Sequence, residues 1–413
     1  MRRPLLIIVI VLALILIGVA IYFVFFRPSA PGIVADDGPL FGDAGDFLGG
    51  GGGTGTPSDE FPQQIIEEVA PRLVKITDGP VAYGVVAMNR TVLPVGSTTA
   101  SSTQTLSKTS VTEVRYVERK SGNIYSYDSK DRVVTRISNK TLPGITEAAW
   151  LPDGSQAFLR FLTENEDGVL QIETYALPAE GEDGGYFLET DLDQVLVFGS
   201  STVVTLLPNS NGSIATMARA DGALPRTLFS SLLSALRLYE AGSGFVAYTK
   251  ASAELEGYGF LIDGTSGAFE RALGPLRGLT LLPSPSGKLI LYGFLSGNAV
   301  KAELLDAITR EKTALPLAAL PEKCAWRRSE LTIYCAVPKN IGNGWPDSWY
   351  QGVVSYSDRI WKIDLQSRTA SLVLDPTVVA TTDIDAVALT VDPDGDLLVF
   401  TNKKDGSLWA YDL

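Results

Sequence analysis

The sequence lacks the side chain that most often carries enzyme chemistry, because none of its 413 residues is histidine. Histidine is the commonest general base and the commonest metal ligand in proteins. Its absence excludes Ser-His-Asp triads, Cys-His dyads and zinc sites that need imidazole. The chain also has only two cysteines, which excludes a four-cysteine metal site. The sequence therefore offers no recognisable catalytic residue, cofactor site or metal site.

The two cysteines, Cys324 and Cys335, lie in short apolar runs joined by a turn around Arg328–Glu330. The two runs are typical of neighbouring antiparallel strands, in which directly opposed residues are close enough for a disulfide. The alternative is a pair of buried free thiols that behave as small apolar side chains. We favour the disulfide, because the body of the chain is also predicted to be exported to a compartment where disulfides form.

Asp392, Asp394 and Asp396 alternate along the chain, as the first ligands of an EF-hand calcium loop do. Such a loop needs Gly at its sixth position and Glu at its twelfth, where this chain has Leu397 and Lys403. The order Asp-Pro-Asp-Gly instead predicts a tight hairpin turn, because proline presets φ and glycine accepts the strained position after it.

An aromatic segment within the stretch Pro338–Tyr356 contains Trp345, Trp349, Tyr350 and Gln351. In the architecture predicted below, this stretch is an insertion between two strands and therefore a surface loop. Exposed aromatic side chains on loops can stack on sugars or anchor a protein partner. The same side chains could instead cover the underlying strands as a packed flap. Both interpretations stay open, and these four residues are the candidates for contact with a partner.

An unbroken apolar run, Leu5 to Phe26, follows a short stub of residues 1–4. As a helix it would be about 33 Å long, enough to cross the hydrocarbon core of a bilayer. It exceeds the roughly 7–15 apolar residues of a signal peptide, so we predict a retained single-pass anchor. Arg2 and Arg3 precede the run and only Arg27 follows it closely. The positive-inside rule then predicts a cytoplasmic-membrane protein with its N-terminus inside and its body outside the cytoplasm.

Residues 27–61 are rich in Gly, Pro and Asp. Such a segment cannot bury enough apolar surface to offset its ordering entropy, so we predict a flexible linker, with the folded body at 62–413.

The formal net charge is −13. A surface of that sign repels phosphate backbones, so we expect no nucleic-acid partner.

Beyond the linker, short runs rich in β-branched and aromatic residues are bounded by Gly, Asp, Asn, Ser and Pro. Such runs are typical of strands in an all-β domain. A pattern of apolar strand, tight turn and second apolar strand recurs at 148–159, 279–291 and 387–399. Candidate first strands of the repeat begin near residues 82, 146, 194, 234, 278, 322 and 385.

These starts are about 40–50 residues apart where no insertion intervenes, a spacing typical of four-stranded propeller blades. Two longer intervals contain insertions, Thr91–Ser110 and Pro338–Tyr356. We therefore predict an all-β, seven-bladed β-propeller behind the N-terminal helix and the linker. The last blade has only three strands before the C-terminus, so we expect Leu73–Thr77 to supply its fourth strand and close the ring.

The turns LPDGS at 151–155 and DPDGD at 392–396 resemble those of TolB/PD40-type, WD40-like propeller repeats. With the segments ITDGPVAYG at 76–84, EKCAW at 322–326 and WYQGVV at 349–354, the chain resembles an uncharacterised family of membrane-anchored propeller proteins of candidate-phylum bacteria. The resemblance implies the propeller fold and a location at the cell envelope. It implies no activity and no catalytic residue.

These features favour a binding or scaffolding module that recruits a protein, a peptide or a glycan. One alternative is a hydrolase or lyase that works with carboxylates and a metal, and another is a structural component of the envelope. Fold alone cannot decide, because propellers host unrelated functions. Converging carboxylates with shifted pKa values in a central pocket would favour the enzyme, whereas an aromatic rim would favour the binding module.

Overall fold

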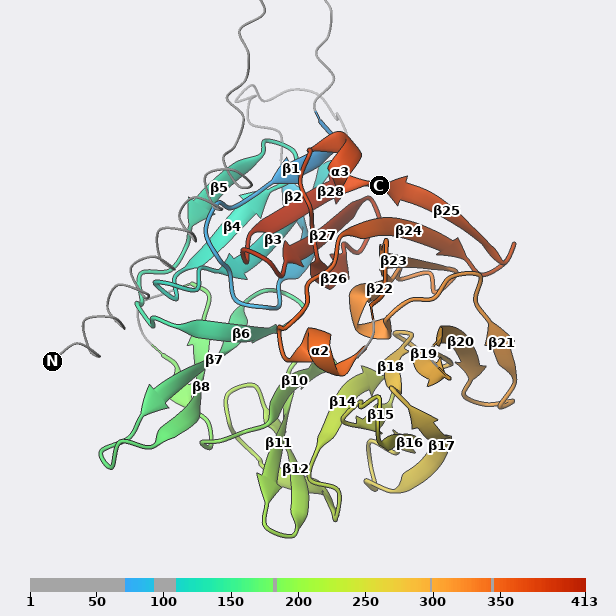
Figure 1. The fold of residues 1–413 in the computed structure, drawn as a ribbon. Coiled ribbons are helices and arrows are strands. Elements are labelled where there is room, and N and C mark those ends of the chain that lie inside the picture. Colours follow the sequence, from blue (N-terminus) through green and yellow to red (C-terminus); the bar gives the residue numbers. More distant parts are fainter. Residues whose placement is uncertain (1–70, 93–108, 181–183, 298, 343–344) are drawn as a thin grey trace, which may run out of the picture. The chain divides into compact units, whose positions relative to one another are not determined.

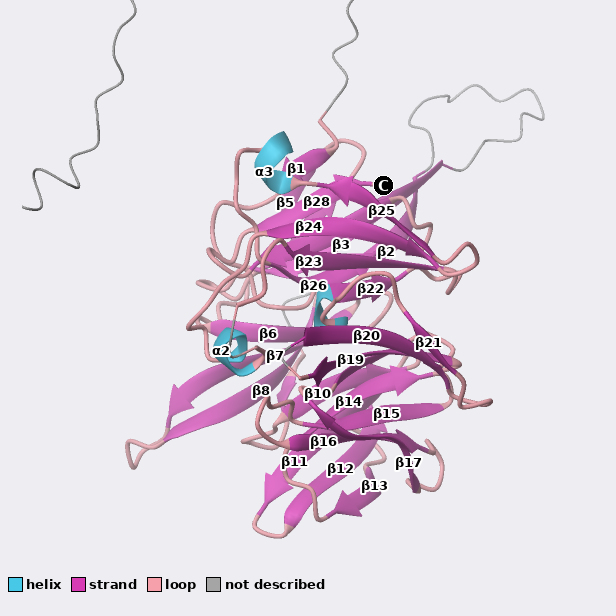
Figure 2. Ribbon diagram, turned by 45° about the vertical axis from the view of Figure 1, so that its right-hand side comes forward, coloured by secondary structure: helices cyan, strands magenta, loops and turns pink. Residues whose placement is uncertain are grey.

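The computed structural model describes residues 71–92, 109–180, 184–297, 299–342 and 345–413. The chain divides into two units, and all described residues belong to the second, Glu68–Leu413. In the described ranges the strands form seven antiparallel sheets of four strands each, and the helices are short (Figure 2). The predicted anchor at 5–26 and linker at 27–61 lie outside these ranges, as do residues 93–108 of the first predicted insertion.

In blades 1 to 3 the four strands of each sheet follow one another in the chain. Blade 1 contains β2 (Val86–Val92), β3 (Thr109–Val117), β4 (Ile124–Asp128) and β5 (Val133–Arg136). Blade 2 contains β6 (Ile145–Trp150), β7 (Gln156–Glu164), β8 (Leu170–Pro178) and β9 (Tyr186–Phe187). Blade 3 contains β10 (Gln194–Phe198), β11 (Thr202–Asn209), β12 (Gly212–Arg219) and β13 (Arg226–Ser231).

Blades 4 to 7 follow in the same order. Blade 4 contains β14 (Leu236–Ala241), β15 (Gly244–Thr249), β16 (Glu256–Ile262) and β17 (Phe269–Arg277). Blade 5 contains β18 (Thr280–Pro283), β19 (Leu289–Ser296), β20 (Ala299–Asp306) and β21 (Lys312–Ala314). Blade 6 contains β22 (Cys324–Trp326), β23 (Thr332–Pro338), β24 (Asp358–Asp364) and β25 (Thr369–Leu374). Blade 7 contains β26 (Ala386–Val391), β27 (Leu397–Asn402), β28 (Leu408–Asp412) and β1 (Leu73–Lys75). The helices are η1 (Pro321–Lys323), α2 (Asp347–Tyr350) and α3 (Pro376–Val379).

The seven blades form a ring, with the first strand of each blade nearest the axis (Figure 1). The prediction of a seven-bladed all-β propeller is confirmed, and the first strands begin within four residues of the predicted starts. The largest departure is in blade 1, where β2 begins at Val86 rather than near residue 82. There Tyr83 forms an isolated parallel bridge to Glu147 of blade 2 instead. Gly84 permits this approach, since its φ is +101° and a Cβ would lie 2.1 Å from the Ala148 carbonyl oxygen.

The antiparallel order of each blade sends its connections to two opposite ends. First-to-second and third-to-fourth connections lie at one end, which we call the turn face. Second-to-third connections and the crossings to the next blade lie at the other end, which we call the loop face. The described chain enters at the turn face, since Arg132 of the β4–β5 turn donates to the Pro71 carbonyl at 2.9 Å. The predicted Asp-Pro-Asp-Gly turn lies there too, with the Asp392 Oδ1 accepting the backbone N–H of Leu397 at 2.8 Å.

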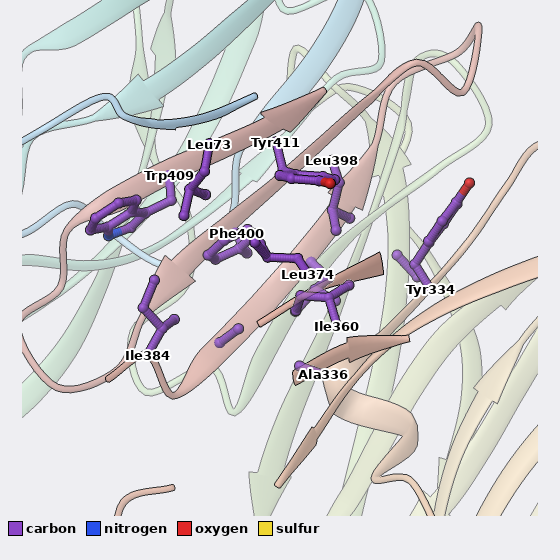
Figure 3. Close-up of a cluster of buried hydrophobic side chains, with 13 residues drawn as sticks. Leu73, Tyr334, Ala336, Ile360, Leu374, Ile384, Leu398, Phe400, Trp409 and Tyr411 are labelled. Atoms are coloured by element: carbon purple, nitrogen blue, oxygen red, sulfur yellow. The ribbon is translucent and has the colours of Figure 1, made fainter. Parts of the chain in front are cut away.

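The apolar core lies between neighbouring blades rather than within one sheet. One cluster between blades 6 and 7 is shown in Figure 3 and includes Tyr334, Ile360, Leu398 and Phe400, all buried. Leu73 of β1 belongs to the same cluster. Each blade therefore depends on two neighbours to cover its faces.

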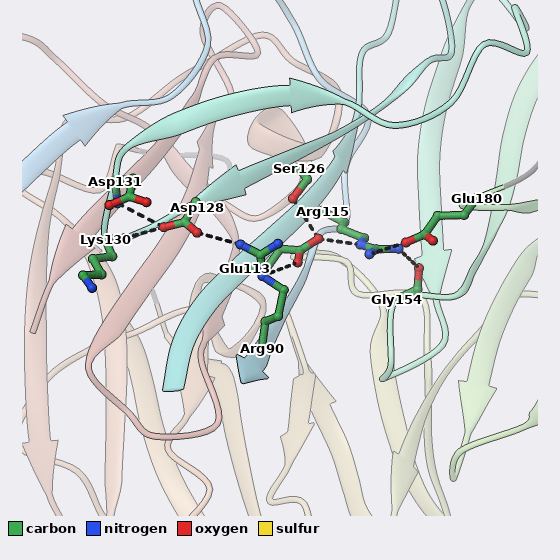
Figure 4. A network of polar contacts seen from close by, with 9 residues as sticks. All are labelled: Arg90, Glu113, Arg115, Ser126, Asp128, Lys130, Asp131, Gly154 and Glu180. Carbon is green, nitrogen blue, oxygen red and sulfur yellow. Dashed lines mark hydrogen bonds and ion pairs between the residues drawn. The ribbon is translucent and has the colours of Figure 1, made fainter. Parts of the chain in front are cut away.

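A buried carboxylate organises the polar side of blade 1 near the turn face (Figure 4). Glu113 accepts from the Ser126 hydroxyl at 2.7 Å and from Arg115 Nε at 2.8 Å. Burial alone would raise the pKa of Glu113, but these two partners and Arg90 hold the pKa below its ordinary value. Arg115 also reaches Glu180 of blade 2 at 2.8 Å, which ties the two blades together.

The ring closes as predicted, because β1 pairs antiparallel with β28 through Leu73↔Tyr411, Val74↔Ala410 and Lys75↔Trp409. The strand lies at 73–75, inside the expected range Leu73–Thr77. No helix within the described ranges combines the length and apolar character needed to cross a membrane.

Removal of the closing strand should destabilise the ring. We expect a chain that begins at Pro57 to unfold cooperatively and stay monodisperse. A chain that begins at Asp78 should unfold several degrees lower and aggregate, because it lacks Leu73 and exposes the edge of β28. Thermal unfolding with light scattering measures both effects. Equal unfolding temperatures and equal monodispersity would contradict the closure.

Candidate functional site

The flap, defined as residues 345–357 between β23 and β24, carries all four residues predicted for partner contact. Its helix α2 lies near the middle of the ring (Figure 1). Trp345 and Trp349 are buried, at 3% and 5% exposure, whereas Tyr350 is 36% exposed and Gln351 is exposed. The two tryptophans therefore pack the flap onto the propeller and leave Tyr350 and Gln351 accessible. That this loop binds a partner stays a prediction.

The flap is fixed to several blades. Trp345, Trp349 and Tyr356 share an apolar cluster with Leu320 of blade 6 and Val387 of blade 7. At the end of the flap nearest blade 4, the Asp347 carboxylate accepts the backbone N–H of Ala253 at 2.7 Å. These contacts make the flap part of the folded ring.

A buried cluster of three charges lies beneath the flap, and we call it the latch. Lys323 Nζ lies 2.6 Å from Asp358 Oδ2 and 2.5 Å from Asp385 Oδ1, and all three side chains are fully buried. Asp358 also accepts the backbone N–H of Ala386 at 2.7 Å. The latch thereby joins η1, β24 and the start of β26. It connects blade 6 to blade 7.

The latch holds the flap by direct hydrogen bonds. Asp385 Oδ2 accepts from Trp349 Nε1 at 3.0 Å and from the Tyr356 backbone N–H at 2.9 Å. Lys323 Nζ lies 5.2 Å from the Trp349 ring centroid, and Lys403 Nζ lies 3.8 Å from it. Lys403 also donates to the Trp349 carbonyl. Trp349 is thus held between two cations and a carboxylate.

A second polar group, the axial cluster, consists of Arg237, Tyr239, Tyr248, Glu322 and Tyr350. Tyr248 donates its hydroxyl to Glu322 Oε1, and the Tyr239 and Tyr248 rings stack with centroids 6.2 Å apart. Arg237 pairs at 3.3 Å with Asp193, which lies in the crossing from blade 2 to blade 3. Three elements, β14, β15 and η1, therefore direct polar groups toward α2.

The axial cluster shifts the proton affinity of its members. Burial raises the pKa of Glu322, against the opposing effects of the Tyr248 and Tyr350 hydroxyls and of Arg237. Burial, and then the nearby Glu322 carboxylate, raise the pKa of Tyr350 well above its ordinary value. A half-buried carboxyl of raised pKa beside tyrosine hydroxyls can exchange a proton or hydrogen-bond a ligand. In the part of the chain that the structure describes, no group of three His, Cys, Asp or Glu side chains is placed to hold a metal ion.

The predicted disulfide is confirmed. Cys324 and Cys335 are directly opposed residues of β22 and β23 and form a disulfide, with their Cα atoms 4.1 Å apart. The bond fixes the strand that directly follows Glu322 and Lys323. It therefore supports both the axial cluster and the latch.

Sequence reasoning missed the latch and the axial cluster. Lys323 and Glu322 directly precede a buried strand, where a charged side chain needs a partner, and that signal was available. Their partners, Asp358, Asp385 and Tyr248, come from distant parts of the chain. Only the packing of the folded blades brings them together.

No protein-family model matches the chain, and no curated protein matches it. Among solved structures, an oligogalacturonate lyase in complex with manganese is 10% identical, with a TM-score of 0.51 over 80% of this chain and 98% of that one. The oligogalacturonate lyase of Vibrio parahaemolyticus gives the same values. TolB of Acinetobacter baumannii is 12% identical, with a TM-score of 0.42 over 62% of this chain. The chain spans 62% of the length of that TolB. The two lyases show a shared propeller fold, and nothing beyond the fold follows from such low identity.

The latch should make stability depend on pH. Burial raises the pKa of Asp358 from 3.8 to about 6, against the lowering effect of Lys323. The folded state therefore binds a proton at Asp358 more tightly than the unfolded state does. The resulting stabilisation of the fold is fully present below about pH 4 and is lost as pH rises through about 6. We expect the difference in unfolding free energy between wild type and Asp358→Asn to change by up to about 3 kcal/mol over this window.

Chemical denaturation at a series of pH values from 4 to 8 measures this difference. Asp383→Asn is the matched control, because Asp383 lies near Asp385 on the crossing from blade 6 to blade 7 but is exposed. Its carboxylate accepts the Ser357 hydroxyl and lies 3.9 Å from Lys404. It should retain the wild-type pH profile. A profile for Asp358→Asn parallel to wild type would contradict the assignment.

Proposed function

We propose that this protein is a single-pass protein of the cytoplasmic membrane, anchored by Leu5 to Phe26. Its propeller lies outside the cytoplasm and binds a protein, peptide or glycan at the loop face. The observation that carries the binding proposal is Tyr350, whose side chain is 36% exposed while its hydroxyl is buried beside Glu322 and near Arg237. Rigid aromatic anchors surrounded by polar groups are typical of recognition sites.

The rigidity of the flap supports this proposal. A loop that must order itself on binding loses conformational entropy, whereas a preordered loop avoids that cost. Here Trp349 is fixed by Asp385 and two lysines, and Tyr350 is its neighbour in α2. The latch therefore presents Tyr350 in one orientation.

Two observations support the location. The apolar run Leu5 to Phe26 has the length of a membrane span, with Arg2 and Arg3 on one side. The Cys324–Cys335 disulfide is expected more often in an exported domain than in the cytoplasm. The described chain begins at the turn face, so the loop face is the end farther from the point where the N-terminal segment joins.

The orientation is testable with a reporter enzyme that is active only outside the cytoplasm. We expect activity when the reporter is fused after Leu413, because the positive-inside rule keeps Arg2 and Arg3 in the cytoplasm. A fusion after Arg3 should be inactive and is the matched control. A stable but inactive fusion after Leu413 would rule out this topology.

Binding at the loop face is testable with the purified full chain on arrays of peptides and glycans. Ligands of the wild type should lose at least roughly tenfold in affinity on Tyr350→Ala, as expected for a central aromatic anchor. Leu224→Ala is the control, since Leu224 is an exposed residue of the β12–β13 turn on the turn face. Equal binding by wild type and Tyr350→Ala would reject the flap as the binding site.

A second candidate is a hydrolase or lyase that acts at the axial cluster, and Glu322 favours it because of its raised pKa and its hydrogen bond from Tyr248. The two similar solved structures are oligogalacturonate lyases, and one of them is in complex with manganese. The described residues do not fit a manganese site, so metal chemistry of that kind is not carried over. Turnover of a bound oligosaccharide that disappears in Glu322→Gln while binding persists would distinguish this candidate.

A further inference from the structure

One hairpin of blade 2 carries apolar side chains into solvent. Strands β7 and β8 are nine residues each, whereas their neighbours β6 and β9 have six and two. The β7–β8 hairpin therefore extends beyond the rest of its blade (Figure 1). Leu162 is opposed to Ile172, and Glu164 to Leu170, so these four side chains share one face of the hairpin. Leu162 and Leu170 are 56% and 64% exposed.

A groove lies beside this hairpin at the outer edge of blades 2 and 3. It has a volume of about 490 Å³ and lies between Tyr186, Phe187 and Leu188 on one side and strands β11 and β12 on the other. Because β9 has only two residues, the outer edge of blade 2 leaves this groove uncovered. Phe187 is 57% exposed at its border, and Glu189 supplies a carboxylate. Asp221 also lines the groove and pairs with Arg219 at 2.7 Å.

The groove and the hairpin form one continuous strip. The Leu188 backbone N–H donates to the Thr174 carbonyl at 2.9 Å, and that of Asp191 donates to the Ile172 carbonyl at 2.8 Å. The segment 186–191 thereby follows β8 from the groove to the exposed part of the hairpin. We call residues 162–172 with 186–191 the hairpin strip.

The charge of the hairpin strip has a single sign. No Lys or Arg occurs between Arg160 and Arg219, a stretch that contains ten Asp and Glu residues. Of these, Glu180 is paired with Arg115 and Asp193 with Arg237. The strip's own carboxylates form no ion pair with any described part of the chain, and they are Glu164, Glu166, Asp167, Glu189 and Asp191.

We propose that the hairpin strip is a docking surface for a basic, amphipathic polypeptide segment. Lysine or arginine side chains of the partner pair with the strip's carboxylates, and its apolar side chains cover Leu162 and Leu170 and enter the groove. Charge complementarity selects this partner, because a second copy of this acidic chain, a nucleic acid or an anionic lipid surface would be repelled. This surface is separate from the flap and does not depend on ligand binding there.

The test uses the full chain and a short fluorescent peptide composed of Lys and Leu. We expect binding that weakens as salt is raised, because the contacts include exposed ion pairs. Peptides of Glu and Leu, or of Lys and Ser, should bind far more weakly, since each lacks one of the two complementary features. The variant Glu164→Lys with Leu170→Ser should lose at least roughly tenfold in affinity for the Lys and Leu peptide.

The matched control is Ile308→Ser with Glu311→Lys, two exposed residues of the β20–β21 turn in blade 5. It changes the net charge equally and should bind as the wild type does. Unfolding temperatures confirm that both variants fold, and Glu166→Lys with Val169→Ser, which has the same change in net charge, replaces the first variant if that one does not. Equal loss in variant and control, no binding to the wild type, or equal binding of the Glu and Leu peptide or of phosphatidylserine vesicles would overturn the proposal.

Discussion

The pairing of β1 with β28 is the contact on which the closed ring depends, because the core of this protein lies between blades. A propeller that opens at one blade interface exposes two apolar sheet faces at once. The closing strand β1 has only three residues, but neighbouring side chains add further contacts to its backbone pairing with β28. Arg72 donates to the Asp412 carbonyl at 2.6 Å and lies over the Tyr411 ring at 4.8 Å. Leu73 completes the apolar cluster of blades 6 and 7.

The latch lies at one of these contacts between blades, where blade 6 meets blade 7. A buried lysine between two carboxylates gains little net stability, because desolvation offsets most of the attraction. Removal of one partner, in contrast, typically costs about 3–5 kcal/mol because the other charge stays buried. Such a cluster therefore favours one arrangement strongly over others. In this molecule that arrangement fixes η1, the start of β26 and the flap relative to one another, since Asp385 contacts both Lys323 and Trp349.

Local patterns in the sequence were sufficient for the blades but not for the site. The turn glycines, the alternating apolar strands and the missing fourth strand are properties of short segments, so blade number and closure could be predicted. The Cys324–Cys335 pair could be predicted for the same reason, because one short turn joins the two strands. The latch could not, since Lys323 and Asp385 are separated by more than a blade in sequence. The short length of β9 could not be predicted either, because its residues Tyr186 and Phe187 are typical of strands of any length.

Both faces of the ring leave large apolar side chains exposed, but only the loop face carries the flap and the extended β7–β8 hairpin. Large apolar side chains reach solvent at many loop-face connections, including Val169, Leu232, Leu255, Val353 and Val378. Leu224 and Ile308 are exposed in the same way at turn-face connections. Scattered exposed aliphatic residues need no explanation by themselves. Here they accompany a flap fixed by a buried charge cluster and a hairpin that extends beyond its blade. Exposed apolar side chains on well-ordered elements are typical of recognition surfaces, whereas solubility alone would favour polar side chains there. We therefore expect partners to bind at the loop face.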